Sequence, residues 1–141
     1  MRYRTWGGWG ALALILAVAL PAHAQYPVKP VRLIIPFGAG SANDIVGRII
    51  APPLSEALGR PLVVENRPGA AGNIGAELVA KSAPDGYTLM MGNIAHSVSM
   101  TLYEKPGYDL VRDFAPVTML AIGSFLLAVH PSVPARTVKQ L

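Results

Sequence analysis

Cysteine is absent from this 141-residue sequence, and its absence excludes three kinds of chemistry. Without thiols the chain has no disulfide framework, no thiolate metal site and no cysteine nucleophile. Histidine is also scarce: His23, His96 and His130 stand far apart, so neither a metal-ligand cluster nor a Ser-His-Asp order emerges. We therefore expect no catalytic residue, no metal and no cofactor.

A long apolar run is missing too, although a short one lies near the start. Two arginines precede an apolar stretch over residues 10–20, which is shorter than the roughly 20 residues needed to span a bilayer. The stretch ends in small residues at Ala22 and Ala24, the pattern of a signal-peptidase site. The sequence thus predicts a signal peptide over 1–24, cleaved before Gln25, and an exported chain without stable membrane insertion.

Charged residues make up only 14% of the chain, and their distribution argues against a nucleic-acid partner. Removal of the predicted signal peptide lowers the formal net charge from +4 to about +2, because two arginines leave with it. The remaining Lys and Arg residues stand singly, without the basic run or stripe that marks a nucleic-acid-binding surface. We expect no nucleic-acid binding.

The mature sequence contains an alternation of strand-like and helix-like patterns. Short, β-branched apolar runs predict three strands, at 31–35, 62–65 and 87–91. Apolar residues at helical spacing predict helices over 43–59 and 73–82. Strand, helix, strand, helix, strand in this order predicts an α/β fold with a parallel sheet.

Two features interrupt or end the first predicted helix. Pro52 and Pro53 stand inside its pattern, and an interior proline removes a hydrogen bond and crowds the preceding turn, at about 3 kcal/mol or more. We therefore expect a kink or a break there. Gly59 is a plausible C-terminal stop.

The later part of the chain has weaker patterns. We expect a short helix over 97–103 and further strands at 116–122 and 125–129. Residues 134–141 indicate a helix that begins after a proline turn and ends after barely one turn. We expect the chain to be a piece of a longer protein; a frayed natural terminus is the alternative.

Three loops follow the first three predicted strands, at 36–41, 66–73 and 92–96. In a right-handed parallel α/β sheet these loops emerge at one edge, where ligands bind. Two of them are glycine-rich, and their unpaired N–H groups at helix starts favour a carboxylate or phosphate. The alternative is that these glycines serve tight turns and close helix packing, and composition alone favours that alternative.

Nucleotide-binding fingerprints are incomplete in these loops. Gly38 and Gly40 are followed by Asn43 where a third glycine belongs, and the spacing of the glycines from Gly69 onward does not fit either. A P-loop is excluded because no Gly-Lys-Ser/Thr follows either turn.

Four polar side chains lie near the loops, and three of them have two interpretations each. His96 is either a base or a structural hydrogen-bonding residue, and a lone histidine favours the second. Asp44 either touches ligand or stabilises the first helix turn, and the second is again favoured. Asn66 and Arg67 either hold their loop or, for Arg67, pair with a ligand carboxylate. Because Pro68 follows and indicates a rigid turn, we favour the scaffold role for Arg67.

Three stretches of the sequence together resemble the Bug proteins, the extracytoplasmic receptors of tripartite tricarboxylate transporters. They are YPVKPVRLIIPFGAGSANDIVGR (26–48), LSEALGRPLVVENRPGAAGNIGAELVAKSAPDGYTLMMG (54–92) and YDLVRDFAPVTMLA (108–121). The ENRPGA-x-G-x-IGA stretch and the PDGYTL turn are specific in their order and spacing. The resemblance covers the mature sequence but less than half of a family chain.

The resemblance implies a two-lobed, type II periplasmic-binding fold that closes on its ligand. It implies that residues 25–121 form most of the first lobe and that 122–141 begin the crossing to the second. A ligand carboxylate would be held largely by backbone amides and ordered waters of the first-lobe loops. The matching ligand-binding positions are Phe37, Gly38, Ala39, Gly40, Ser41 and Asp44; Gly69, Ala70, Ala71, Gly72 and Asn73; and Asn93, Ala95 and His96.

The sequence departs from the family pattern at several positions. Ser99-Met100 stands where the family often has Asn-Pro, which could shift the helix start, and Gly38 and Ser41 replace the commoner Pro and Gly. These departures bear on loop shape and stability more than on membership.

The function expected from the resemblance is capture of a small organic carboxylate in the periplasm and its delivery to membrane transporter subunits. No bond is made or broken. A ligand-binding sensor subunit with a membrane signalling partner is an alternative that uses the same pocket. A secreted α/β enzyme is less favoured, because the sequence offers no nucleophile, metal cluster or complete nucleotide fingerprint.

Overall fold

The computed structural model describes residues 26–124 and 126–141, so the predicted signal peptide lies outside the described residues. Its elements in chain order are β1 (Val31–Ile35), α2 (Ala42–Leu58), β2 (Leu62–Asn66), the 3₁₀ turn η2 (Ala70–Gly72), α3 (Asn73–Ala80), β3 (Thr88–Met90), α4 (Ile94–Leu102) and the 3₁₀ turn η3 (Val138–Gln140). Among the described residues, no helix has both the length and the apolar character to cross a membrane.

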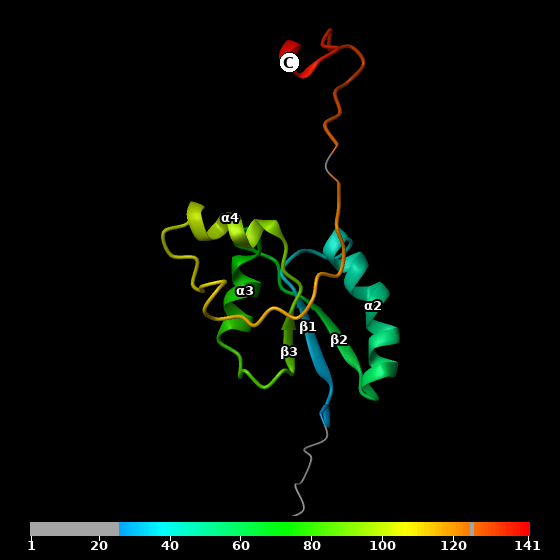
Figure 1. Ribbon diagram of the computed structural model, residues 1–141, viewed down its shortest axis with the longest axis vertical. Coiled ribbons are helices and arrows are strands. Elements are labelled where there is room, and N and C mark those ends of the chain that lie inside the picture. Colours follow the sequence, from blue (N-terminus) through cyan, green and yellow to red (C-terminus); the bar gives the residue numbers. More distant parts are fainter. Residues whose placement is uncertain (1–25, 125) are drawn as a thin grey trace, which may run out of the picture.

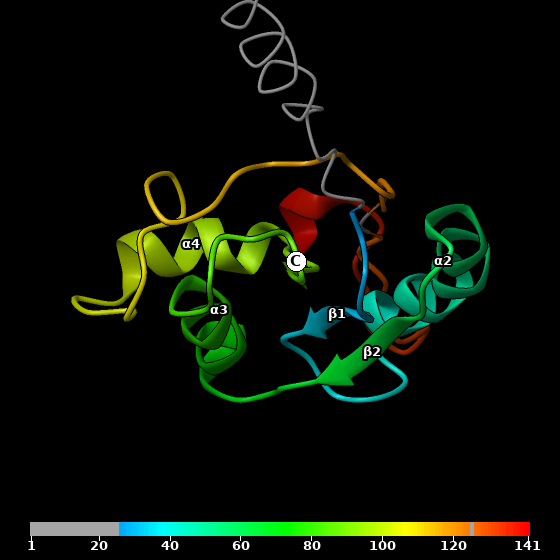
Figure 2. The same ribbon diagram turned by 90° about the horizontal axis from the view of Figure 1, so that it is seen from below.

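The three strands form one parallel sheet in the order β2-β1-β3. The central strand β1 pairs Val31 with Leu62 on one side and Arg32 with Thr88 on the other. Helix α2 lies on one face of the sheet, whereas α3 lies on the other (Figures 1 and 2). This arrangement explains the nearly continuous apolar run of β1 and confirms the predicted parallel α/β sheet.

The core lies between the sheet and α2, and a second close contact fixes α3. Val31, Leu33 and Ile35 alternate along β1 and pack together on the α2 face. Gly47 lets α2 approach them, because a Cβ there would stand 2.6 Å from Ile35 Cδ1. On the other face, a Cβ on Gly75 of α3 would stand 2.8 Å from the Arg67 carbonyl oxygen, so backbone meets backbone.

Helix α2 runs without interruption through Pro52 and Pro53, so of the kink or break expected there, the break is wrong. The two prolines remove the N–H donors that would reach the carbonyls of Arg48 and Ile49, one turn earlier. Both of those residues are exposed, as are the prolines, so water can satisfy the freed carbonyls. The predicted stop is confirmed: Gly59 has a φ of 65° and its N–H donates to the Glu56 carbonyl.

Helix α4 begins three residues earlier than the expected start at 97, and a capping box explains the difference. The Asn93 side chain accepts a hydrogen bond from the Ala95 N–H at 2.9 Å, and the Asn93 N–H donates to His96 Nδ1 at 3.1 Å. Asn93 and His96 thus satisfy backbone donors at the helix start. Ser99, at the departure from the family pattern, lies buried inside the helix.

The apolar runs predicted as strands at 116–122 and 125–129 form no strand among the described residues. Val117, Ile122 and Leu126 are 83%, 82% and 90% exposed. A strand is stabilised by pairing and by burial of one face, and none of β1, β2 and β3 pairs with this segment. The described part of this segment extends away from the body of the molecule, in orange in Figure 1.

The PDGYTL turn holds the chain just ahead of β1. The Tyr26 hydroxyl donates to the Gly86 carbonyl at 2.6 Å, and the Val28 N–H donates to the Tyr87 hydroxyl at 2.9 Å. The two tyrosine rings meet edge to face at 5.0 Å, and Lys29 Nζ lies 4.2 Å from the centre of the Tyr87 ring. These contacts form a clasp at the amino ends of the strands.

Candidate functional site

The three loops predicted to share one edge of the sheet do so in the structure. We call residues 36–41 the first loop, 66–73 the second and 92–96 the third. The Asn43 side chain donates to the Met91 carbonyl at 3.3 Å and accepts from the Asn93 side chain at 3.5 Å, which joins the start of α2 to the third loop. The Asn66 side chain donates to the Phe37 carbonyl at 3.1 Å, which joins the second loop to the first.

The first loop wraps around the amino end of α2. Ser41 is the N-cap, and its hydroxyl accepts from the Asp44 N–H at 3.3 Å. The Ser41 N–H donates to the Gly38 carbonyl at 3.2 Å, which closes the turn. Gly40 has a φ of 79°, a conformation that favours glycine. Ser41 therefore serves the helix, and Gly38, Ala39 and Gly40 form the exposed part of the loop.

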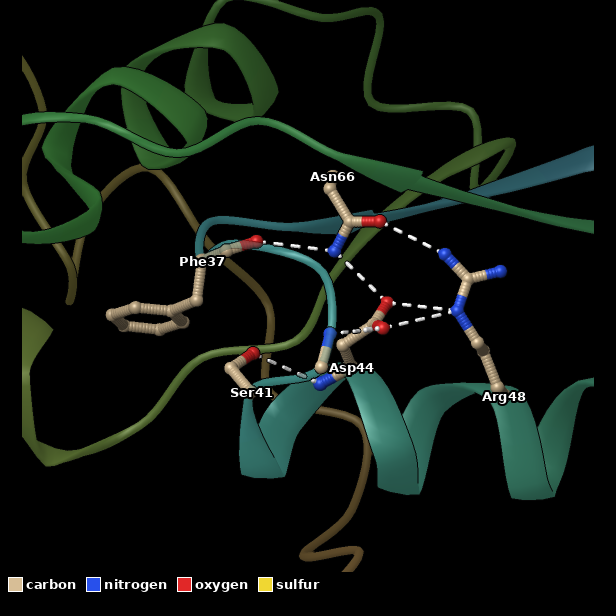
Figure 3. A network of polar contacts seen from close by, with 6 residues as sticks. Phe37, Ser41, Asp44, Arg48 and Asn66 are labelled. Atoms are coloured by element: carbon tan, nitrogen blue, oxygen red, sulfur yellow. Dashed lines mark hydrogen bonds and ion pairs between the residues drawn. The ribbon is translucent and has the colours of Figure 1, made fainter.

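The carboxylate of Asp44 is bound on all sides by the protein (Figure 3). It accepts from Arg48 Nε at 3.0 and 3.1 Å, from the Gly40 N–H at 2.8 Å and from Asn66 Nδ2 at 2.9 Å. These donors, Arg48 first, then Gly40 and Asn66, lower the pKa of Asp44 from 3.8 to about 2. Asp44 thus holds the first loop and α2 together.

Arg67 is paired with an acid of β2, the strand that it directly follows. Its guanidinium donates to Glu65 Oε2 at 3.0 Å, and Arg32 of β1 donates to both Glu65 oxygens at 2.7 and 3.0 Å. Arg32 above all, and Arg67 in addition, lower the pKa of Glu65 to about 2. In this pairing Arg67 belongs to the scaffold that carries the second loop.

The second loop has a strained backbone. Four successive residues have positive φ angles: Gly69 at 133°, Ala70 at 46°, Ala71 at 57° and Gly72 at 96°. Alanine in a left-handed conformation costs roughly 1–2 kcal/mol, and such strain clusters where a ligand is held. Ala70 and Ala71 are both exposed, so their backbone is open to a ligand.

The predicted site residues divide into two groups. The exposed group consists of small residues and the cap of α4: Gly38, Ala39, Gly40, Ala70, Ala71 and Asn93. The buried group consists of Gly72 and of three residues whose side chains contact the protein itself, Asp44, Asn73 and His96. Phe37, Ser41, Gly69 and Ala95 are intermediate. The site therefore presents backbone groups outward and turns its polar side chains inward.

Sequence reasoning missed two residues that support the second and third loops. The Tyr108 hydroxyl donates to Asn73 Oδ1 at 3.0 Å, and the Tyr108 ring lies 6.4 Å from the His96 ring. Phe114 packs edge to face on Tyr108 at 5.9 Å. The only available signal was the aromatic pair itself inside the stretch YDLVRDF, which has no periodicity to assign it to the site.

The chemistry that this arrangement offers is hydrogen bonding to an anion by backbone N–H groups. Helices α2, α3 and α4 all begin at this edge, so three positive dipole ends face the same region (Figure 1). In the part of the chain that the structure describes, no group of three His, Asp or Glu side chains is placed to hold a metal ion.

Comparison with solved structures defines the class of protein. The chain matches the periplasmic binding protein BugD with a TM-score of 0.58 and 42% identity, over 60% of this chain and 28% of BugD. It matches MatC of Rhodopseudomonas palustris, solved with bound malate, with a TM-score of 0.64 and 38% identity, over 67% of this chain and 33% of MatC. It matches R. palustris Rpa4515, solved with adipate, with a TM-score of 0.69 and 38% identity, over 82% of this chain and 39% of Rpa4515. The fold is that of the periplasmic binding proteins, and the predicted fold class is confirmed.

Comparison of sequences identifies the family. A model of the tripartite tricarboxylate transporter family receptor matches residues 46–141. BugT of Bordetella pertussis is 35% identical over 127 residues, which cover 88% of this chain and 39% of BugT. The chain belongs to the tripartite tricarboxylate transporter receptor family, as the resemblance to Bug proteins implied. It spans about two fifths of the length of this curated relative.

Proposed function

We propose that this chain supplies the carboxylate-binding loops of a periplasmic solute receptor, which delivers its ligand to membrane subunits of a tripartite transporter. The observation that carries the proposal is the group of exposed small residues at one sheet edge, where three helices begin. Each helix start favours an anion by about 0.3–1 kcal/mol near the surface. The malate and adipate bound by MatC and Rpa4515 support a small organic acid as the ligand.

The nearby cations favour binding by backbone rather than by a side chain. Arg48 is paired with Asp44, and Arg67 is paired with Glu65, so both guanidinium groups already have a carboxylate partner. The Gly40 N–H donates to Asp44, but Gly38, Ala39 and Gly40 carry no bulky side chain, so a ligand carboxylate can approach the N–H groups of Gly38 and Ala39 closely. In this proposal the receptor makes and breaks no covalent bond.

The proposed test is calorimetric titration of the protein expressed from its complete reading frame with malate, succinate and adipate. We expect Gly40→Val to weaken binding by about tenfold or more, because its side chain obstructs the close approach of ligand and strains a position with a φ of 79°. Arg67→Lys keeps the charge toward Glu65 and should bind within about threefold of the native protein. Loss of binding in Arg67→Lys with retention in Gly40→Val contradicts the proposal.

We also propose that residues 25–121 form most of the first lobe of a two-lobed receptor and that 122–141 begin the crossing to the second. A ligand held between two lobes loses water contacts and gains contacts from both, at about 0.5–1.5 kcal/mol net per hydrogen bond. The chain over 25–141 alone should therefore bind the same acid about a hundredfold more weakly than the complete protein. Titration of both with one acid measures the difference, and equal affinities contradict the two-lobe arrangement.

The proposed location is the periplasm, after removal of residues 1–24. Family relatives such as BugD are periplasmic binding proteins. The small residues Ala22 and Ala24 favour cleavage before Gln25. The intact mass of protein recovered from the periplasm should correspond to a chain that begins at Gln25; a mass that includes residues 1–24 contradicts the cleavage.

A further inference from the structure

The three loops meet at a single contact, to which each contributes one residue. Phe37 of the first loop and His96 of the third stand edge to face, with ring centres 5.6 Å apart. Gly72 of the second loop lies against both: a Cβ there would stand 3.0 Å from His96 Nε2 and 3.2 Å from Phe37 Cζ. A shift of any one of these residues therefore changes its contacts with the other two loops.

The two ring nitrogens of His96 have different surroundings. Nδ1 lies 3.1 Å from the Asn93 nitrogen, whose N–H it accepts in the capping box, and 3.2 Å from the Asn93 carbonyl oxygen. In the tautomer that forms the capping box, Nδ1 is the acceptor and the proton of the neutral imidazole is on Nε2. Nε2 is buried and has no hydrogen-bond partner among the described residues, although it lies beside Gly72. A buried N–H without a hydrogen-bond partner is costly, so its presence here calls for an explanation other than packing.

The helix cap alone does not account for this histidine. A glutamine or glutamate is the usual partner at this position of a capping box, and it needs no aromatic ring. His96 is 0% exposed, so in this structure its ring offers no open surface to a ligand at the loops. Its effect on a ligand must pass through the loops that it contacts.

We propose that His96 is a positioning residue for carboxylate binding, which sets the second loop against the third through the contact of its Nε2 edge with Gly72. The inference rests on the proposed function of these loops. In this proposal, Nδ1 of His96 fixes Asn93 at the start of α4. The Nε2 side of the same ring determines where the strained turn from Gly69 to Gly72 lies. The two loops then present their N–H groups to one anion.

The surroundings favour the neutral ring. Phe37 and Ser99 carry no charge, and Tyr108, at 6.4 Å between ring centres, is the titratable side chain that packs against His96. Burial lowers the pKa of His96, an effect that the Asn93 and Gly72 backbone partly offsets. A second proton on Nδ1 would also remove the acceptor of the Asn93 N–H, and Nδ1 would then face the Asn93 carbonyl oxygen at 3.2 Å as a donor.

Two substitutions separate the roles of the two nitrogens. Asn places its side-chain oxygen where Nδ1 stands and so keeps the cap, whereas Gln reaches toward the Nε2 position. In the protein expressed from its complete reading frame, we expect His96→Gln to bind malate or adipate within about threefold of the native protein and His96→Asn about tenfold more weakly. Both should stay folded by circular dichroism. His130→Gln, at an exposed histidine outside the loops, is the matched control.

A measurement without ligand keeps this inference separate from the proposed function. Nitrogen-15 spectra of the imidazole should show the proton on Nε2, and the amide resonances of Ala71 and Gly72 should shift in His96→Asn more than in His96→Gln. If the native protein binds no carboxylate, the proposed function fails while these spectra still decide the loop contact. A proton on Nδ1, or equal affinity and equal shifts in the two variants, overturns the inference.

Discussion

At the scale of single residues, the left-handed alanines of the second loop store conformational energy. Ala71 has a φ of 57° and a ψ of 26°, a region that glycine occupies without the cost of a Cβ. Ala71→Gly should therefore raise the free energy of unfolding by about 0.5–1 kcal/mol, the strain relieved less the entropy that glycine adds to the unfolded chain. Urea denaturation measures the change.

A matched substitution in a helix should have the opposite sign. Ala57 is exposed and lies in α2, where glycine is a poor helix former. Ala57→Gly should lower the free energy of unfolding by about 1 kcal/mol. If Ala71→Gly is as destabilising as Ala57→Gly, the second loop is not strained at Ala71.

The Asp44 network makes a prediction about acid stability. Because the folded-state pKa of Asp44 is lowered from 3.8 to about 2, the network stabilises the fold fully above pH 4 and loses this effect as the pH falls toward 2. Asp44→Asn should reduce the thermal midpoint at pH 7, and its remaining stability should fall less between pH 4 and pH 2 than that of the native chain. Thermal unfolding followed by circular dichroism across that range tests the prediction.

The control for this experiment is an acid on the same helix that faces solvent. Glu56→Gln removes one negative charge from α2 at an exposed position. We expect it to leave both the midpoint and its acid dependence close to native. An identical response of the two variants would mean that overall charge, rather than the contacts of Asp44, sets the acid dependence.

Some residue roles could be predicted from local chemistry, whereas others could not be predicted from the sequence. The helix-start role of Asp44 follows from an acid in a first turn, and the scaffold role of Arg67 follows from the rigid Pro68 beside it. The contact of His96 with Gly72 joins two loops far apart in sequence, and the bond between Tyr108 and Asn73 spans 35 positions. Such contacts depend on how the loops fold, which no spacing along the chain encodes.

At the scale of elements, α2 stays helical although its interior contains Pro52 and Pro53, which disfavour a helix. Each interior proline costs about 3 kcal/mol relative to alanine in a helix, partly offset because proline also restricts the unfolded chain. Pro52→Ala together with Pro53→Ala restores two donors for α2 and should raise the free energy of unfolding by about 1 kcal/mol or more. Urea denaturation measures this change, and a decrease would show that the prolines fit their positions better than alanine.

The elements that sequence located well are those with a complete local signal. β1 and β2 combine β-branched runs with flanking turns, and α2 ends at its glycine as predicted. The start of α4 was missed because Asn93 and His96 cap it together, and the second partner is not the usual glutamate or glutamine. The break at Pro52 and Pro53 was wrong because tertiary packing of the opposite face of α2 outweighs the local cost.

At the scale of the whole molecule, the exposed segment beyond Ala115 should govern how the chain behaves in solution. Phe114 is still packed on Tyr108, whereas Val117 and Ile122 are more than four fifths exposed. Ending the chain after Ala115 should change its free energy of unfolding by less than about 0.5 kcal/mol, because the removed residues bury little. The same change should reduce self-association, since exposed apolar surface drives it.

Light scattering during size-exclusion chromatography, at several concentrations, measures the association. The matched control is a variant of the 141-residue chain with Val117→Asp and Ile122→Asp, because it removes apolar surface without shortening the chain. Both changes should lower the apparent mass at high concentration. Unfolding of either variant would show that the segment supports the body of the molecule.

The α/β class was predictable as a whole because strand and helix signals alternate over residues 31–91. The segments at 116–122 and 125–129 have equally apolar sequences and form no strand among the described residues. An apolar run reports that a segment needs burial, and it carries no information on which partner provides it.

The clasp of Tyr26 on Gly86 and Tyr87 gives the molecule two distinct poles. It fixes the chain ahead of β1 at the amino ends of the strands, while the three loops lie at the carboxyl ends. A dye, an affinity handle or a solid support attached ahead of Tyr26 is therefore anchored at the pole opposite the loops. Mounted in this way on an optical chip, the molecule would leave the loops facing the sample, an orientation suited to a biosensor.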